Sequence, residues 1–111
     1  MAFDERLGDR IREAVAGVPG VREKRMFGGL AFLQHGKMFV GVIGDDLMAR
    51  VGKPAHAVAL EQAHVRPMDF SGRPMDGYVY VAPEGVDMDV DLQRWIDQCL
   101  DFVATLPDKP A

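Results

Sequence analysis

The stretch GGLAFLQHGKMFVGVIGDDLMARV, residues 28–51, decides the fold of this chain. It holds three runs rich in apolar and β-branched residues, which are typical of strands, at 28–34, 37–44 and 46–51. Polar turns of hairpin length separate these runs, at His35-Gly36 and Asp45-Asp46. Turns this short join antiparallel neighbours, because parallel strands need a long crossover. The stretch therefore predicts an antiparallel meander.

Residues 21–27, VREKRMF, add one strand at the start of the meander. The pair Gly28-Gly29 lies between this run and the next, and both positions escape the steric penalty of a Cβ atom. Such a pair suits a β-bulge or a tight bend, and a bulge is the use we expect here.

Helices are predicted on both sides of the meander. Residues 3–18 carry apolar side chains at spacings of three and four, which indicates an amphipathic helix with Asp4 as its N-cap. Residues 87–106 predict a second long helix with a wide apolar face. Aspartates crowd its first turn, where carboxylates meet the positive end of the helix dipole.

Shorter elements lie between the meander and the last helix. Residues 54–63 predict a short helix that begins with Pro54, and residues 64–83 predict two extended segments joined through Ser71-Gly72. The full order is α-β-β-β-β-α-β-β-α. We expect a two-layer α+β fold, with the helices packed on one mostly antiparallel sheet.

Length and composition predict a single cytoplasmic domain. With 111 residues, 48% hydrophobic and 27% charged, the chain has the size and balance of one globular domain spanning 1–111. No apolar run approaches the roughly 18 residues needed to cross a bilayer. The amino terminus alternates charges where a signal peptide needs an apolar run, and the lone Cys99 cannot form an intramolecular disulfide. We therefore expect no membrane association.

The charge balance argues against direct nucleic-acid binding. The net charge is -4, the isoelectric point is near 5.2, and the last quarter of the chain is acidic. Binding to a phosphate backbone needs clustered Lys and Arg. An accessory role in a DNA-bound complex would need one basic face formed by Arg22, Lys24, Arg25 and Arg50.

The most unusual local feature is a tandem repeat, in which Arg66-Pro67-Met68-Asp69 is followed by Arg73-Pro74-Met75-Asp76. In a functional interpretation, the guanidiniums hold an anionic ligand or an acidic partner and the carboxylates orient them. In a structural interpretation, which the frequency of exposed ion pairs favours, the prolines stiffen a turn while Arg and Asp pair in solvent. The candidate interaction or ligand residues are Arg66, Asp69, Arg73 and Asp76.

The sequence offers little for catalysis or for metal binding. Ser71 is the only serine, and no nucleophile motif surrounds it. Cys99 lies on the apolar face of the last predicted helix, which favours burial over reactivity. Metal-ligand spacing is absent from the three histidines, His35, His56 and His64. We therefore predict no catalytic residues, no metal, no cofactor and no enzymatic activity.

Methionines are frequent in the predicted strands, at Met26, Met38, Met48, Met68 and Met75. Adaptable thioethers could line a groove for a partner, but filling of the core is their expected use.

Three strings give the chain a family resemblance: MFGGLAF at 26–32, VIGDDLMARV at 42–51, and RPMDF through GRPM to GYV at 66–79. Over most of its length the chain resembles the amino-terminal domain of the TfoX/Sxy family of bacterial competence regulators. The resemblance implies a two-layer α+β domain with an antiparallel sheet, in which dimers are common. In full-length regulators a carboxy-terminal domain follows and the pair switches on DNA-uptake genes, whereas here we expect a stand-alone domain.

These features predict a non-enzymatic regulatory or protein-interaction module, linked to transcriptional or competence regulation. We expect it to form a homodimer and to engage another protein through the sheet or through the loop of the tandem repeat. The alternative is a sensor of a small anionic ligand, or an uncharacterised enzyme, that uses the four Arg and Asp residues of that loop.

Overall fold

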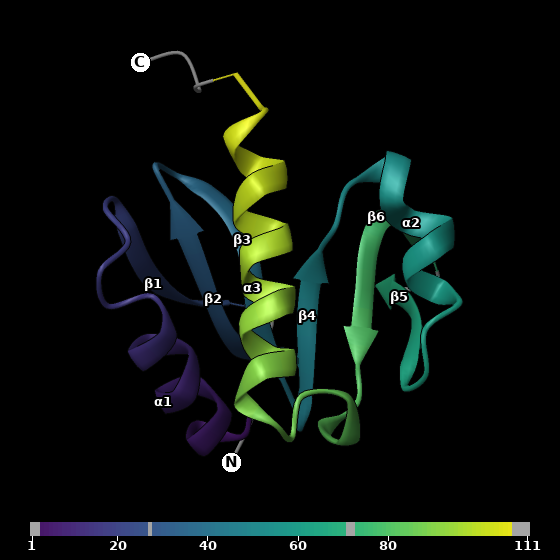
Figure 1. The fold of residues 1–111 in the computed structure, drawn as a ribbon, viewed down its shortest axis with the longest axis horizontal. Coiled ribbons are helices and arrows are strands. Elements are labelled where there is room, and N and C mark those ends of the chain that lie inside the picture. The colour runs from purple at the N-terminus through teal and green to yellow at the C-terminus, as the bar shows by residue number, and fades with distance from the viewer. Residues whose placement is uncertain (1–2, 27, 71–72, 108–111) are drawn as a thin grey trace.

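The computed structural model of the chain describes residues 3–26, 28–70 and 73–107. Its elements follow the predicted order, with one additional short 3-10 helix, η1, before the last α-helix (Figure 1). In chain order they are α1 (Glu5–Ala14), β1 (Val21–Met26), β2 (Gly29–Gln34), β3 (Lys37–Ile43), β4 (Asp46–Arg50), α2 (Lys53–Leu60), β5 (Val65–Phe70), β6 (Arg73–Val81), η1 (Pro83–Gly85) and α3 (Asp89–Ala104).

The strands form one six-stranded sheet in the order β1-β2-β3-β4-β6-β5. Every neighbouring pair is antiparallel, and β1 to β4 follow one another as the predicted meander. β4 and β5 therefore run parallel to each other with β6 between them, and α2 connects them as parallel strands require. The α+β fold with helices on an antiparallel sheet is confirmed.

The turn between β1 and β2 shows what the glycine pair does. The last residue pair of these two strands is Met26 with Gly29, and Gly28 has a left-handed φ of 71°, so the pair forms a tight bend. A Cβ atom on Gly29 would clash with the carbonyl oxygen of Val42 on the neighbouring strand. The expected bulge is not at this pair, because the register shifts instead between Phe32 and Leu33. The predicted joint at Ser71-Gly72 lies outside the described residues.

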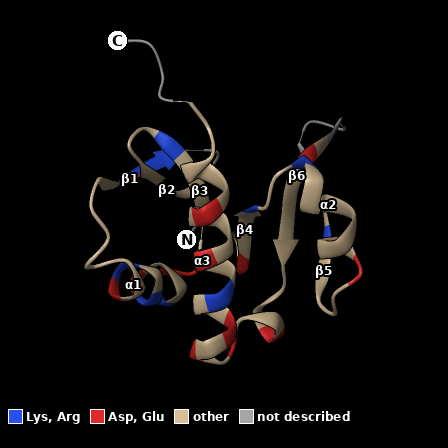
Figure 2. Cartoon of the chain, turned by 45° about the horizontal axis from the view of Figure 1, so that its top comes forward, with Lys and Arg blue, Asp and Glu red and all other residues tan. Residues whose placement is uncertain are grey.

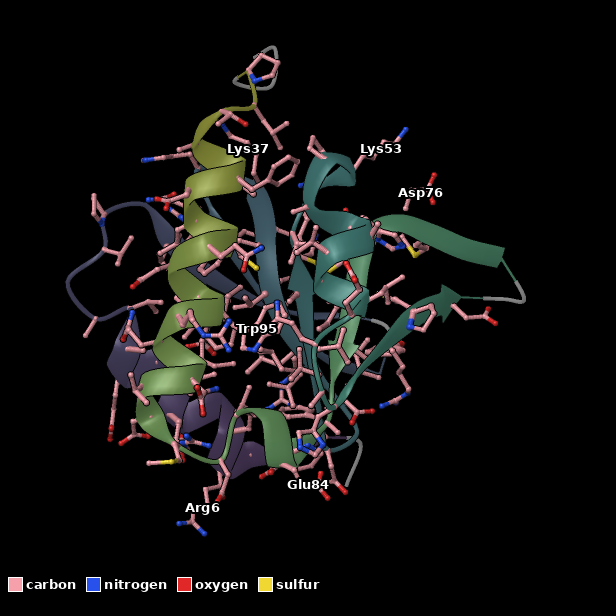
Figure 3. The ribbon with its side chains drawn as sticks, turned by 45° about the vertical axis from the view of Figure 1, so that its right-hand side comes forward. Arg6, Lys37, Lys53, Asp76, Glu84 and Trp95 are labelled. Carbon is pink, nitrogen blue, oxygen red and sulfur yellow. The ribbon has the colours of Figure 1, made fainter. Side chains whose placement is uncertain are left out.

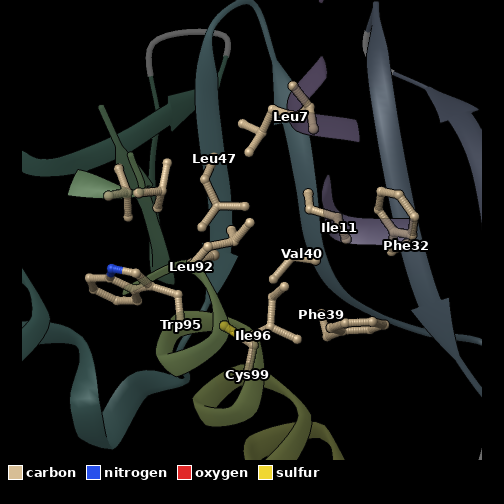
Figure 4. Packing of buried hydrophobic residues seen from close by; sticks show 14 of the residues in the cluster. Leu7, Ile11, Phe32, Phe39, Val40, Leu47, Leu92, Trp95, Ile96 and Cys99 are labelled. Carbon is tan, nitrogen blue, oxygen red and sulfur yellow. The ribbon is translucent and has the colours of Figure 1, made fainter. Parts of the chain in front are cut away.

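All three α-helices cover the same face of the sheet (Figures 1 and 2). α3 packs on β3 and β4, α1 lies beside α3, and α2 packs on β6 and β5. Between helices and sheet lies one cluster of buried apolar side chains, to which α3 contributes Trp95, Ile96 and Cys99 (Figure 4). Burying side chains of this size stabilises a fold by about 1.5–3 kcal/mol each.

The helix boundaries differ from the predicted ones where tertiary contacts intervene. Asp4 caps α1 as predicted, since its carboxylate accepts hydrogen bonds from two amides of the first turn. α3 begins at Asp89 rather than at Asp87. The guanidinium of Arg10 donates hydrogen bonds to the carbonyl oxygens of Val86 and Asp87, at 2.7 and 3.2 Å, and so holds the chain before the helix. α1 itself ends at Ala14, before the predicted end of the helix, as the chain turns toward β1.

Candidate functional site

Contacts along β1 assign its residues to the two faces of the sheet. Glu23 accepts hydrogen bonds from Arg12 of α1 at 2.7 and 2.8 Å, so it points toward the helices. Arg25 does the same, since its guanidinium lies 5.4 Å from the ring centroid of Phe3. Successive side chains of a strand point to opposite faces. The opposite face therefore receives Arg22 and Lys24.

The strand register extends this second face across the sheet, because directly paired residues share a face. Arg22 pairs with Leu33, which pairs with Met38, and Met48 pairs with both Gly41 and Tyr80. No α-helix of the described chain packs on this side, and we call it the helix-free face. Its larger apolar residues are Leu33, Met38, Ile43, Met48, Tyr78 and Tyr80.

The methionines are distributed unevenly between the two faces of the sheet. The cluster beneath the helices contains none of the described methionines, although Met48 and Met68 are only 1% and 2% exposed. The expected burial is therefore confirmed for Met48 and Met68, although neither belongs to the cluster beneath the helices. Met26 and Met38 lie half-buried on the helix-free face, in register with Gly29 and Leu33. This face thus carries adaptable thioethers with no helix above them.

The charged part of the helix-free face is organised around Arg66. Its guanidinium forms an ion pair with the carboxylate of Asp46 on β4 and lies over the ring of Tyr80, 5.0 Å from the centroid. The Asp46 carboxylate raises the pKa of Arg66 above its usual value. Arg66 is therefore a fixed positive group on a surface that also carries Arg22 and Lys24.

Comparison with family models places the chain in a known group. The model of the TfoX N-terminal domain matches residues 13–103. The chain belongs to the TfoX N-terminal domain family. Comparison with curated proteins and with solved structures gave no significant match. The matched range includes every strand of the sheet, and hence the whole of the helix-free face.

In this TfoX N-terminal domain the tandem repeat does not form one cluster of described side chains. Arg66 pairs with Asp46, whereas Asp69 is exposed on β5 opposite Pro74. Asp76 lies on β6 near the start of α2 (Figure 3). The two copies lie on different strands, the first in β5 and the second in β6, and the register between these strands shifts between Pro67 and Asp69. Arg73 lies in β6 opposite Phe70, and its side chain is outside the described part of the chain.

The basic residues do not share one face either. Arg22 and Lys24 lie on the helix-free face, but Arg25 contacts Phe3 on the helix side. Arg50 lies at the end of β4, 5.5 Å from the ring centroid of Tyr78 and 5.7 Å from that of Phe102. The basic face needed by an accessory to a DNA-bound complex is therefore not formed. Sequence reasoning missed the aromatic contacts of Arg50, which come from distant segments.

The other described residues considered for metal binding or catalysis lie in turns, at strand ends, in a helix or in the core. Asp45 lies in a turn and Asp46 begins β4, and His56 accepts a hydrogen bond from the amide of Gly77 at 3.0 Å. Cys99 is buried as predicted, and burial raises the pKa of its thiol to about 12. In residues 3–26, 28–70 and 73–107, no three His, Cys, Asp or Glu side chains are grouped as a metal would need. Within the same ranges, no helix has the length and apolar character to span a membrane.

Proposed function

We propose that this domain is a non-enzymatic, cytoplasmic protein-interaction module that acts in bacterial regulation and holds its partner on the helix-free face. The observation that carries the proposal is the exclusion of the strand methionines from the core beneath the helices. Half-buried methionine and tyrosine side chains adapt their shape to a partner at low cost. A sheet face of this composition is suited to covering by another protein.

The charges of the helix-free face indicate the charge that a partner should carry. The chain as a whole has a net charge of -4, yet Arg22 and Lys24 lie exposed on the helix-free face and Arg66 is held there by Asp46. The acidic residues of α3 belong to a helix on the opposite side of the sheet (Figure 2). Complementary charge speeds association and fixes orientation. We therefore propose a partner that presents an apolar segment flanked by Asp or Glu.

The chemistry of the nucleophile candidates supports a role without catalysis. A thiol whose pKa is about 12, as for Cys99, holds almost no thiolate at neutral pH. The sequence has two aliphatic hydroxyl groups that could act as nucleophiles, on Ser71 and on Thr105. The hydroxyl of Thr105 donates a hydrogen bond to the carbonyl of Phe102 at 2.6 Å. The proposal therefore assigns the activity of the domain to binding.

Capture of a partner from lysate tests the proposal. The tagged domain and the double variant Arg22→Glu/Lys24→Glu are compared by mass spectrometry of the proteins that they retain. We expect a stoichiometric protein with the unmodified domain and its loss with the double variant. Arg6→Glu is the matched control, since Arg6 is an exposed cation on α1, away from the helix-free face. Equal retention by all three proteins would contradict the proposal.

The homodimer implied by the family resemblance stays a prediction. Light scattering of the purified domain decides it, because a dimer has about twice the chain mass of 12.2 kDa. If a second copy occupies the helix-free face, the Arg22→Glu/Lys24→Glu variant should change this mass as well as partner capture.

A further inference from the structure

The side chain of Arg50 lies among β3, β6 and α3 rather than on an open face of the sheet. The last residue pair that joins β3 to β4 is Val40 with Ala49, and beyond it Arg50 donates a hydrogen bond to the carbonyl of Met38 at 3.2 Å. Its guanidinium lies between the rings of Tyr78 on β6 and Phe102 on α3. The side chain is half-buried, so its charge is partly removed from water.

A cavity of about 330 Å³ adjoins this guanidinium. Its walls come from three parts of the fold: the end of α3, the start of α2 and the middle of β6. Phe102 and Leu106 form one apolar side, Pro54 and Tyr78 contribute more apolar surface, and Lys53 and Asp76 stand nearby (Figure 3). A volume of this size holds a small molecule of about the size of a single aromatic ring with a short substituent.

No carboxylate of the described residues forms an ion pair with Arg50, whose guanidinium contacts two aromatic rings instead. A guanidinium has five N–H donors, and in the described part of the chain Arg50 uses them for one hydrogen bond, to Met38. None of the ion pairs formed by the described residues involves Arg50, although Asp76 lines the same cavity. A half-buried arginine with free donors that face an apolar cavity is suited to a carboxylate, which it can hold with two parallel hydrogen bonds.

We propose that this cavity binds a small monocarboxylate with an apolar body, whose carboxylate pairs with Arg50 and whose body lies against Phe102 and Leu106. Lys53 adds positive charge at the cavity, while the carboxylate of Asp76 disfavours ligands with two or more negative charges. The cavity shares Tyr78 with the helix-free face, but binding of a small carboxylate there requires no partner protein.

Titration with phenylacetate tests the proposal, followed by calorimetry or by NMR chemical shifts of the cavity residues. We expect saturable binding, and a loss of affinity of roughly tenfold or more in Arg50→Gln, since a charge-assisted pair is lost. The matched control is Arg94→Gln. Arg94 also lies over an aromatic ring, 5.3 Å from the centroid of Trp95, but it is not part of the cavity.

A second variant guards against the possibility that Arg50→Gln does not fold. Leu106→Trp fills the cavity from its half-buried rim and leaves every charge in place, so it should also abolish binding. Neutral phenylacetamide should bind at least tenfold more weakly than phenylacetate, and inorganic phosphate should not compete. Absence of saturable phenylacetate binding would overturn the proposal, as would equal affinity for phenylacetamide or unchanged binding by the Leu106→Trp variant.

Discussion

Arg66 on β5 and Asp46 on β4 form an ion pair although strand β6 runs between them. The guanidinium crosses β6 over the ring of Tyr80, which is paired with Arg66 in the strand register. The contact therefore links three strands on the helix-free face. It also orients a positive group toward the surface that we assign to a partner.

The Arg66→Ala variant should lose partner capture while its stability changes little. The Arg66 side chain is 52% exposed, and exposed ion pairs contribute about 1 kcal/mol or less. Thermal unfolding monitored by circular dichroism gives the stability, and capture from lysate gives the binding. A large fall in the free energy of unfolding would instead mark Arg66 as a residue that holds the sheet together.

Replacement of Gly29 by alanine should destabilise the domain by about 1–3 kcal/mol, because a Cβ atom there would clash with the carbonyl oxygen of Val42. Gly17→Ala is the matched control. A Cβ atom at Gly17 meets nothing within 4 Å, so its effect should stay within about 0.5 kcal/mol. Chemical denaturation of both variants measures the difference, and equal stability would show that the turn between β1 and β2 can shift.

The ion pair of Glu23 with Arg12 should make stability depend on pH in the acid range. The hydrogen bond from Arg12 lowers the pKa of Glu23 below its ordinary value of 4.5. A carboxyl group with a lowered pKa stabilises the fold above that ordinary value, and this stabilisation is lost as the pH falls through the lowered pKa. Because the side chain is 37% exposed, solvent screening limits the contribution to about 1 kcal/mol or less.

The comparison of Glu23→Gln with the unmodified domain measures this contribution. The variant should be less stable at pH 7, and this difference should shrink as the pH falls through the lowered pKa of Glu23, because protonation of the carboxyl group removes the ion pair. Glu84→Gln is the control, since Glu84 is exposed and forms none of the ion pairs among the described residues. A difference in stability between Glu23→Gln and the unmodified domain that does not shrink as the pH falls would exclude the ion pair as its cause.

Cys99 should be unreactive in the folded domain. Its side chain is 0% exposed, and burial raises the pKa of the thiol to about 12, so a thiol reagent at pH 7 should modify it only after denaturant is added. Cys99→Ser should cost about 1–3 kcal/mol, because a more polar hydroxyl replaces the thiol in a fully buried position. Rapid modification of the native protein would contradict its place in the core.

The sequence predicted those features of the fold that depend on local patterns. The meander followed from short turns between apolar runs, and α3 followed from its wide apolar face, because both signals lie within a few residues. The glycine pair was assigned to a bulge wrongly, since a bulge and a tight turn need the same backbone freedom. Only the paired register of β1 and β2 distinguishes the two.

The candidate site was harder to predict because its contacts join distant segments. Asp69 and Asp76 are equivalent positions in the two copies of the string, yet they lie on different strands, β5 and β6, and have different surroundings. Arg50 faces an aromatic ring from α3, far away in the sequence. The methionines show the same limit, since the strand pattern does not tell which face of a sheet the helices cover.

Photo-crosslinking from single sites tests the use of the helix-free face most directly. A photoreactive residue is placed at Leu33, on β2 within that face, or at Gln93 on α3. We expect one dominant crosslinked protein from position 33 in cells, and none of that protein from position 93. Crosslinking of the same partner from position 93 and not from position 33 would contradict this expectation, because the partner would then bind the helices.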